Sequence, residues 1–304
     1  MTENTPSIVV VGSVNLDIVV PVPHHPRPGE TVLGSDHFSN PGGKGANQAV
    51  AAARLGQRVA MVGCVGDDDA GADLRASLEV EGVDADRVVA LGGVPTGIAL
   101  ISVDQEGENT IIVSPGANTR VDAEAVEGAQ DLLASAKVTL LQLEIPVETV
   151  AAAAGAACGM VVLNPAPGRP LDHDLLAQVD VLVPNLGELA MLSGDEVPGA
   201  GLDAAEALAS TIQGPGAVVV TLGSQGALVV AGGDSVHILG AEVRAVDTTA
   251  AGDSFCGALA DGLVRGLELE AAARWAVKAA ALTVTRQGAQ PSLPTRAEVE
   301  GLTT

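Results

Sequence analysis

The amino-acid sequence predicts an α/β fold in which helices cover both faces of a mostly parallel β-sheet. Two observations support this prediction. Short runs rich in Val, Ile and Leu alternate with Ala-rich stretches along most of the 304 residues, and such alternation is typical of parallel strands joined by helices. The first run, Ser7–Ser13, is apolar almost throughout, as expected of a strand that is buried on both faces.

The expected elements follow one another from the N-terminus. Strands are expected at Ser7–Ser13, Arg58–Val65, Lys137–Leu143, Met160–Asn164, Val179–Pro184 and Ala217–Leu222. Helices are expected at Lys44–Leu55, Asp69–Glu81, Asp122–Ala136, Val147–Ala157, Leu202–Ile212 and Asp253–Gly266. Gly56 and Gly266 stand where two of these helices end, a position that glycine often takes. Because no linker divides the chain into halves, we expect one domain over residues 1–304.

Two segments interrupt the alternation of strands and helices. The first, residues 16–38, contains four prolines and then an extended piece at Glu30–Phe38. The second contains two expected strands, Thr96–Val103 and Asn109–Ser114, joined by the turn-rich residues 104–108, which is a hairpin pattern. We expect these two segments to pair into one small sheet that lies over the main sheet.

The composition excludes several classes of protein. Asp and Glu number 38 against 15 Lys and Arg, so the net charge of −23 disfavours nucleic acid and anionic membranes as partners. Aromatic residues are 1% of the chain, too few for stacking on exposed bases. Three widely spaced cysteines predict neither a disulfide framework nor a zinc site. With no signal-peptide pattern and no run long enough to span a bilayer, we expect a cytoplasmic protein.

The most informative stretch is Ala245–Phe255, where small and polar residues lead into an Ala- and Leu-rich helix. Ala250, Ala251 and Gly252 would place backbone N–H groups at the helix N-terminus, which is a favourable position for an anion. Asp253 beside such an anion would need a task of its own, such as accepting a proton from an attacking hydroxyl. A helix N-cap is an equally good interpretation of Asp253 from these residues alone.

Further polar residues stand where expected strands end or helices begin. Pro41–Gln48 is a second Gly-rich start of a helix, although it matches no nucleotide-binding glycine motif and fits a flexible turn as well. Asn15 and Asp17 follow the first strand, Glu144 follows the third, and Asn185–Glu188 follows the fifth. Ligands bind at the carboxyl ends of strands in open parallel sheets. Turn formation and helix capping are the alternatives for these residues.

These motifs resemble those of the ribokinase-like sugar kinases, the PfkB carbohydrate kinase family. The resemblance runs from about Val9 to Pro294, and it is carried chiefly by Gly-Gly-Lys-Gly-Ala-Asn47 and by Asp247-Thr-Thr-Ala-Ala-Gly-Asp253. It implies a three-layer sandwich with a small β-sheet lid, formed by residues 16–40 and 95–115, through which two chains form a homodimer. It also implies ATP-dependent phosphorylation of D-ribose at O5. A kinase of the same fold for deoxyribose, fructose or adenosine and a non-catalytic sugar sensor are the alternatives.

The resemblance also assigns roles to individual residues. Asp253 would be the catalytic base, and Ala250, Ala251 and Gly252 would form an anion hole. The sugar would be held by Asn15, Asp17, Gly43, Lys44, Asn47 and Glu144. ATP would lie against Asn185, Thr221, Gly223, Ser224, Gly226 and Gly252, with Glu188 acting indirectly on Mg²⁺. An activating K⁺ would be surrounded by Asp247, Thr249, Thr283, Arg286, Gly288 and Ser292, several of them through carbonyls.

Overall fold

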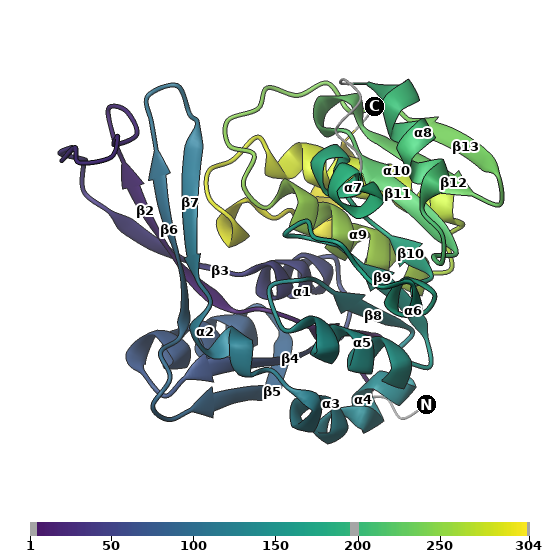
Figure 1. The fold of residues 1–304 in the computed structure, drawn as a ribbon, viewed down its shortest axis with the longest axis horizontal. Helices are drawn as coiled ribbons and strands as arrows, with labels where there is room; N and C mark the ends of the chain where they lie inside the picture. The colour runs from purple at the N-terminus through teal and green to yellow at the C-terminus, as the bar shows by residue number, and fades with distance from the viewer. Residues whose placement is uncertain (1–4, 195–200, 303–304) are drawn as a thin grey trace.

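The computed structural model describes residues 5–194 and 201–302, which form two β-sheets and the helices around them (Figure 1). Residues 1–4 lie outside the described residues. They belong to the N-terminal segment in which the sequence shows no signal-peptide pattern. The larger sheet has nine strands in the order β13-β12-β11-β10-β9-β8-β1-β4-β5. Its strands are β1 (Ile8–Val11), β4 (Val59–Gly66), β5 (Val83–Leu91), β8 (Val138–Leu141), β9 (Met160–Leu163), β10 (Val181–Leu182), β11 (Ala217–Thr221), β12 (Ala227–Ala231) and β13 (Asp234–Ile238).

The seven strands from β5 to β11 in the sheet order all run parallel, and β12 is antiparallel to both of its neighbours, β11 and β13. The predicted mostly parallel sheet is therefore confirmed. Ile8 and Val10 of β1 belong to one hydrophobic core, whereas Val9 and Val11 belong to the other. This alternation follows from the two-residue period of a strand, and it explains why every residue of β1 is buried and apolar.

The helices cover both faces of the large sheet and complete a three-layer arrangement. Helices α1 (Lys44–Arg54), α2 (Asp69–Val80), α9 (Ala251–Val264) and α10 (Leu269–Thr283) contribute to the first core. The second core takes residues from α3 (Ala123–Gly128), α4 (Gln130–Ser135), α5 (Val147–Ala156), α6 (His173–Leu176), α7 (Leu186–Ser193) and α8 (Leu202–Thr211). Helix α11 (Arg296–Gly301) lies near the C-terminus and packs on α10.

Helices α1 and α9 cross at very short range because small residues meet at the crossing. A Cβ atom added to Gly257 of α9 would lie 2.6 Å from Ala51 Cβ and 2.8 Å from the Gln48 carbonyl oxygen of α1. No side chain larger than glycine fits there without moving one helix. This crossing brings the first turns of both helices together at the same edge of the large sheet.

The smaller sheet has four strands in the order β3-β2-β6-β7. They are β2 (Asn15–Pro21), β3 (Phe38–Gly42), β6 (Gly97–Val103) and β7 (Asn109–Ser114). Strands β2, β6 and β7 project beyond the main body of the molecule (Figure 1). The expected hairpin at residues 96–114 is confirmed, and it pairs in parallel with β2, so the two interrupting segments do form one sheet.

The observed elements differ from the sequence prediction in some details. Of the extended piece expected at Glu30–Phe38, only Phe38 belongs to a strand, because β3 begins there and residues 30–37 have no regular secondary structure. Ser35 N donates to Pro21 O, so this segment lies beside the end of β2. The helix expected at Asp122–Ala136 is divided at Ala129, whose ψ of 10° departs from helical geometry. Strand β5, helices α6, α10 and α11, and the β12–β13 hairpin were not among the expected elements.

Within the described residues, no helix is both long enough and apolar enough to cross a membrane.

Candidate active site

The start of α1 is built on glycine. Gly43 is the N-cap and has a φ of 89°, in the left-handed region where glycine carries no steric penalty. A Cβ atom at Gly43 would lie 2.7 Å from Asn15 N, and one at Gly45 would lie 2.6 Å from Ser13 N. The two glycines thus let α1 begin directly against the segment that follows β1.

Glu144 fixes this start of α1 to the end of β8. Its Oε2 atom accepts hydrogen bonds from Ser13 Oγ at 2.6 Å and from the backbone N–H of Lys44 at 3.1 Å. Glutamate at a helix N-terminus satisfies a free N–H group and interacts favourably with the helix dipole. The carboxylate predicted at this strand end therefore joins two of the predicted motifs.

The start of α9 has free backbone N–H groups that face a cavity. Ala250 is the N-cap, and no side chain caps the helix. Ala250 has a φ of 59°, and among the described residues it is the only non-glycine residue with a positive φ. The first N–H groups of a helix have no partner within it. Those of the first turn of α9 face a polar cavity that is lined by Ala250, Ala251, Gly252 and Asp253, which is the geometry of an anion-binding helix N-terminus.

Asp253 is the third residue of α9, so the interpretation of this residue as an N-cap is wrong. Its side chain is buried, and its two oxygens accept hydrogen bonds from Asn47 Nδ2 at 3.0 Å and Gln48 Nε2 at 3.1 Å. Burial raises the pKa of Asp253, while the Lys44 ammonium and the two amide donors act in the opposite direction without cancelling it. Asp253 is a raised-pKa carboxyl group at a helix N-terminus, as a general base requires.

Lys44 supplies the positive charge of this region. It lines the polar cavity of about 210 Å³ together with Asp253 and Glu188. Burial lowers the pKa of Lys44, but the carboxylates of Asp253, Glu144 and Glu188 outweigh burial and raise it. The ammonium group therefore stays charged at neutral pH and faces the same cavity as the free N–H groups of α9.

Asn185 and Glu188 form a capping box at the start of α7. Asn185 Oδ1 accepts from Glu188 N at 2.8 Å, and Glu188 Oε2 accepts from Asn185 N at 2.9 Å. The capping interpretation of these residues is confirmed. Both residues also line the polar cavity, and burial raises the pKa of Glu188. One motif thus serves the helix and presents a carboxylate to the cavity.

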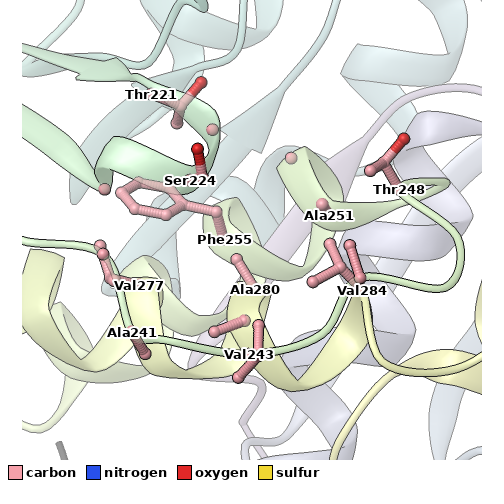
Figure 2. A pocket seen from close by; sticks show the side chains of 16 residues that line it. Thr221, Ser224, Ala241, Val243, Thr248, Ala251, Phe255, Val277, Ala280 and Val284 are labelled. Atoms are coloured by element: carbon pink, nitrogen blue, oxygen red, sulfur yellow. The ribbon is translucent and has the colours of Figure 1, made fainter.

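A second, apolar cavity of about 410 Å³ adjoins the polar one. The two cavities share Thr221, Thr248, Ala251 and Gly252. Figure 2 shows apolar side chains, including Phe255, Val277 and Ala280, along its walls, with the hydroxyl groups of Thr221 and Ser224 at one side. Gly223, Ser224 and Gly226, which the family resemblance assigns to ATP, all line this cavity. An apolar slot that opens onto an anion site suits a purine nucleotide.

A third cavity of about 750 Å³ lies between the small sheet and two loops of the main body. Asp17 and Asn40 line it from the small sheet, and Asp247, Thr249 and Gly288 line it from the loops. Asn15 and Asp17 are buried on the same side of β2, as their alternation predicts. Burial, followed by the charges of Glu144 and Asp253, raises the pKa of Asp17 to about 7 against the opposing effect of Lys44.

Sequence reasoning missed the residue that orients Asn15. Asn118, in the short 3₁₀ helix Gly116–Arg120 after β7, donates from Nδ2 to Asn15 Oδ1 at 2.7 Å. Asn118 is itself held by Val14 N and Val14 O. The Asn15 carboxamide is therefore fixed with its NH₂ group free for another acceptor. The one indication in the sequence was that Asn118 is a polar residue shortly after the expected strand Asn109–Ser114.

The residues expected around a cation are only partly brought together. Asp247 joins two loops, because Oδ1 accepts from Thr249 N at 2.9 Å and Oδ2 accepts from Gly288 N at 2.8 Å. Arg286 instead forms an ion pair with Glu298 at 2.6 Å. The hydroxyls of Thr283 and Ser292 lie against Ala279 O and Ala289 O. The side chains of Arg286, Thr283 and Ser292 thus have partners other than Asp247, and no group of three His, Cys, Asp or Glu within the described residues could hold a metal ion.

An anion-binding helix N-terminus, a buried carboxylate beside it and an adjoining nucleotide-sized slot define a small-molecule kinase. The model of the pfkB family of carbohydrate kinases matches residues 5–296, and the chain belongs to this family. It is 42% identical to a ribokinase of Schizosaccharomyces pombe, with 97% of each chain covered. It is 37% identical to a deoxyribokinase of Salmonella typhimurium, with 94% of this chain and 95% of the other covered.

A solved structure shows the same architecture. The ribokinase of Arabidopsis thaliana complexed with ribose and ATP has a TM-score of 0.86 and 33% sequence identity to this chain. The superposition covers 97% of this chain and 98% of the other. The similarity therefore extends over both the large and the small sheet.

The raised pKa of Asp17 predicts a pH-dependent stability. Because the folded pKa of about 7 exceeds the 3.8 of an exposed aspartate, the free energy of unfolding falls as pH rises between these values. Asp17→Asn cannot titrate and therefore does not lose this stability. From pH 5 to pH 8, its free energy of unfolding relative to that of the wild type should increase by on the order of 1–3 kcal/mol. Urea unfolding at both pH values measures the gain, with the exposed Asp73→Asn as control. A difference between Asp17→Asn and wild type that does not change with pH contradicts the burial of this carboxyl group.

Proposed function

We propose that this chain transfers the γ-phosphoryl group of ATP to O5 of D-ribose, giving D-ribose 5-phosphate and ADP. The observation that carries the proposal is the position of Asp253, a buried carboxyl group that lines the polar cavity together with the first turn of α9. The similarity to ribokinases over nearly the whole chain supports ribose as the sugar. The use of ATP makes the cytoplasm the expected compartment.

In this proposal, Asp253 accepts the proton of the sugar hydroxyl as its oxygen attacks the γ-phosphorus in line. The N–H groups of Ala250, Ala251 and Gly252 stabilise the negative charge that develops on the transferring phosphoryl oxygens, since they point at that position before the reaction begins. Lys44 adds a positive charge on the same cavity. Asn47 and Gln48 donate hydrogen bonds to the Asp253 carboxylate and keep it in position before it accepts the proton.

Mg²⁺ fits the polar cavity through the Glu188 carboxylate, because oxygen ligands and nucleotide phosphates are what this ion prefers. When bound, it would neutralise part of the negative charge of the nucleotide phosphates. The apolar slot between Phe255 and Val277 would take the purine. Asn15, Asp17, Gly43, Asn47 and Glu144 would surround the sugar from β2, α1 and the end of β8.

Ribose is a better proposal than adenosine, because the chain has no Tyr, one Trp and two Phe with which to stack a substrate base. Deoxyribose is the second candidate, because one relative is a deoxyribokinase. The two sugars differ by a single hydroxyl group that a carboxylate such as Asp17 can accept as a hydrogen bond.

The rate constants for ribose and 2-deoxyribose test the choice of sugar. A site built to bond a hydroxyl group rejects the analogue that lacks it by up to on the order of 10⁴, and by less where water enters. We expect a higher kcat/KM for ribose than for 2-deoxyribose in an assay of ADP release. Equal kcat/KM values would contradict a ribose site, and a preference for 2-deoxyribose would favour the second candidate.

Asp253→Asn tests the base. The substitution keeps the size of the side chain and removes the basic oxygen, so kcat should fall by roughly 10²–10⁴-fold. Ribose binding, measured by calorimetry without ATP, should change little. A purified Asn variant that keeps most of the wild-type kcat would show that Asp253 is not the base.

We also propose that K⁺ activates the enzyme near Asp247, Thr249 and Gly288, with carbonyls of Thr283, Arg286 and Ser292 as further ligands. Asp247 already ties the two loops by hydrogen bonds, and one carboxylate with several carbonyls suits a large monovalent cation. By stiffening the turn before Ala250, K⁺ should raise kcat or lower substrate KM.

Titration with KCl against a bulky organic cation at equal ionic strength measures this activation. Asp247→Ala should lose it, whereas Asp234→Ala in the distant β12–β13 hairpin should keep it. Activity that is indifferent to K⁺, or an Asp247→Ala variant with an unchanged response, would overturn the cation site.

We further propose a homodimer in which the small sheet of each chain covers that of the other. All of β7 is exposed, and Leu100, Ile111, Ile112 and Val113 are large apolar residues on this sheet. Ile112→Lys should convert a dimer into a monomer in sedimentation velocity, and Val80→Lys, on α2, should not. A monomeric wild type would contradict the proposal.

A further inference from the structure

A chain of buried amide side chains leads from the end of β8 to the candidate base. Gln142 follows β8, and its Nε2 donates to Gln48 Oε1 of α1 at 2.7 Å. Gln48 Nε2 donates to Asp253 Oδ1 of α9 at 3.1 Å. Gln142 and Gln48 are both fully buried. The three residues come from elements far apart in the sequence and meet only in the fold.

The contacts of Gln48 fix which way its carboxamide points. Besides Asp253, its Nε2 lies 3.3 Å from Asn164 Oδ1. Asn164 must present this oxygen, because its own Nδ2 donates to the carbonyl of Val183. The donor from Gln142 then occupies Gln48 Oε1. Turning the Gln48 carboxamide over would break all three bonds and face its oxygen towards the Asp253 carboxylate.

Gln142 carries a cost that packing does not explain. Its Oε1 is buried without a hydrogen-bond partner, and such an atom destabilises the fold. A Cβ atom at Gly12 would collide with this same oxygen, so the glycine makes room for the Gln142 side chain. An apolar side chain would avoid the unpaired oxygen, yet it would leave Gln48 Oε1 without its donor.

We propose that Gln142 is a positioning residue for the phosphoryl transfer, which acts by holding Gln48 so that its NH₂ group stays on Asp253. Gln142 touches neither substrate region. It sets the orientation of Gln48, and Gln48 in turn fixes one oxygen of the base and stabilises its ionised form. The inference rests on the proposed function of Asp253 as the base.

Other groups also act on Asp253 and stay in place when Gln142 changes. Lys44 and Asn47 of α1 favour the ionised form of Asp253, whereas Glu144 after β8 disfavours it. Asp17 of β2 and Glu188 of α7 also interact with Asp253 through their charges. A change at Gln142 therefore removes one contribution among several, and its effect should be smaller than that of losing the base.

Gln142→Leu removes the donor and keeps an apolar side chain of similar size. With ribose and ATP, kcat should fall about 3- to 10-fold, as expected for the loss of one neutral hydrogen bond. The acid limb of the kcat–pH profile should move to higher pH, because Asp253 loses support for its ionised form, and the KM for ATP should stay unchanged. Gln142→Met serves in its place if the Leu variant does not fold.

Thr139→Val is the matched control. Thr139 lies on β8, is fully buried and has an unpartnered hydroxyl group, so its replacement changes the same strand without touching Gln48. A kcat and an acid limb in Gln142→Leu equal to those of Thr139→Val would overturn the proposal. So would a Gln142→Leu effect of full size in a Gln48→Leu background, because the relay requires the effect of Gln142 to pass through Gln48.

Different measurements test the positioning role of Gln142 and the proposed ribose kinase activity. If the wild type does not phosphorylate ribose, the proposed function is wrong. The positioning of Asp253 is then measured by ¹³C NMR titration of the carboxyl groups, assigned with Asp253→Asn. Gln142→Leu should raise the pKa of Asp253 relative to wild type and Thr139→Val, and an unchanged pKa would overturn the relay on its own.

Discussion

The burial of one carboxylate at the crossing of α1 and α9 governs the arrangement of the site. A buried carboxylate is costly unless donors surround it, and Asp253 obtains its donors from Asn47 and Gln48 on the neighbouring helix. These bonds require the two helices to approach closely. Gly257 allows that approach, since a Cβ atom there would lie 2.6 Å from Ala51 Cβ. The small residues at the helix crossing therefore allow the hydrogen bonds that hold the Asp253 carboxylate.

The same crossing places opposite charges around one small cavity. The N-terminus of α9 attracts an anion, whereas Asp253 and Glu188 repel it. Lys44 resolves this conflict, because its ammonium faces the cavity and its pKa is raised by the surrounding carboxylates. Asp253 remains near an incoming phosphate and keeps a pKa above its ordinary value. In the proposed mechanism, backbone N–H groups and one lysine therefore hold the phosphate in a site with fewer positive charges than negative ones.

The sequence predicted what depends on local pattern. The apolar run at Ser7–Ser13 marked a strand buried on both faces, and the alternation of apolar runs with Ala-rich stretches predicted the mostly parallel sheet. It could not decide between an N-cap and a base at Asp253, because the left-handed Ala250 that takes the cap position is not an expected choice at φ above zero. It also missed Asn118 and the Gln142–Gln48 bond, which join residues 103 and 94 positions apart. Such pairs leave no periodic signal.

A crystal structure with ribose, ADP and an aluminium fluoride mimic of the transferring phosphoryl group tests the joint role of Asp253 and the α9 N-terminus most directly. The mimic should accept hydrogen bonds from the N–H groups of residues 250–252. O5 of ribose should lie within hydrogen-bond distance of Asp253, about 2.6–3.2 Å, in line with the leaving oxygen of ADP. A ribose bound with O5 out of reach of Asp253, or a mimic held away from the first turn of α9, would contradict this mechanism.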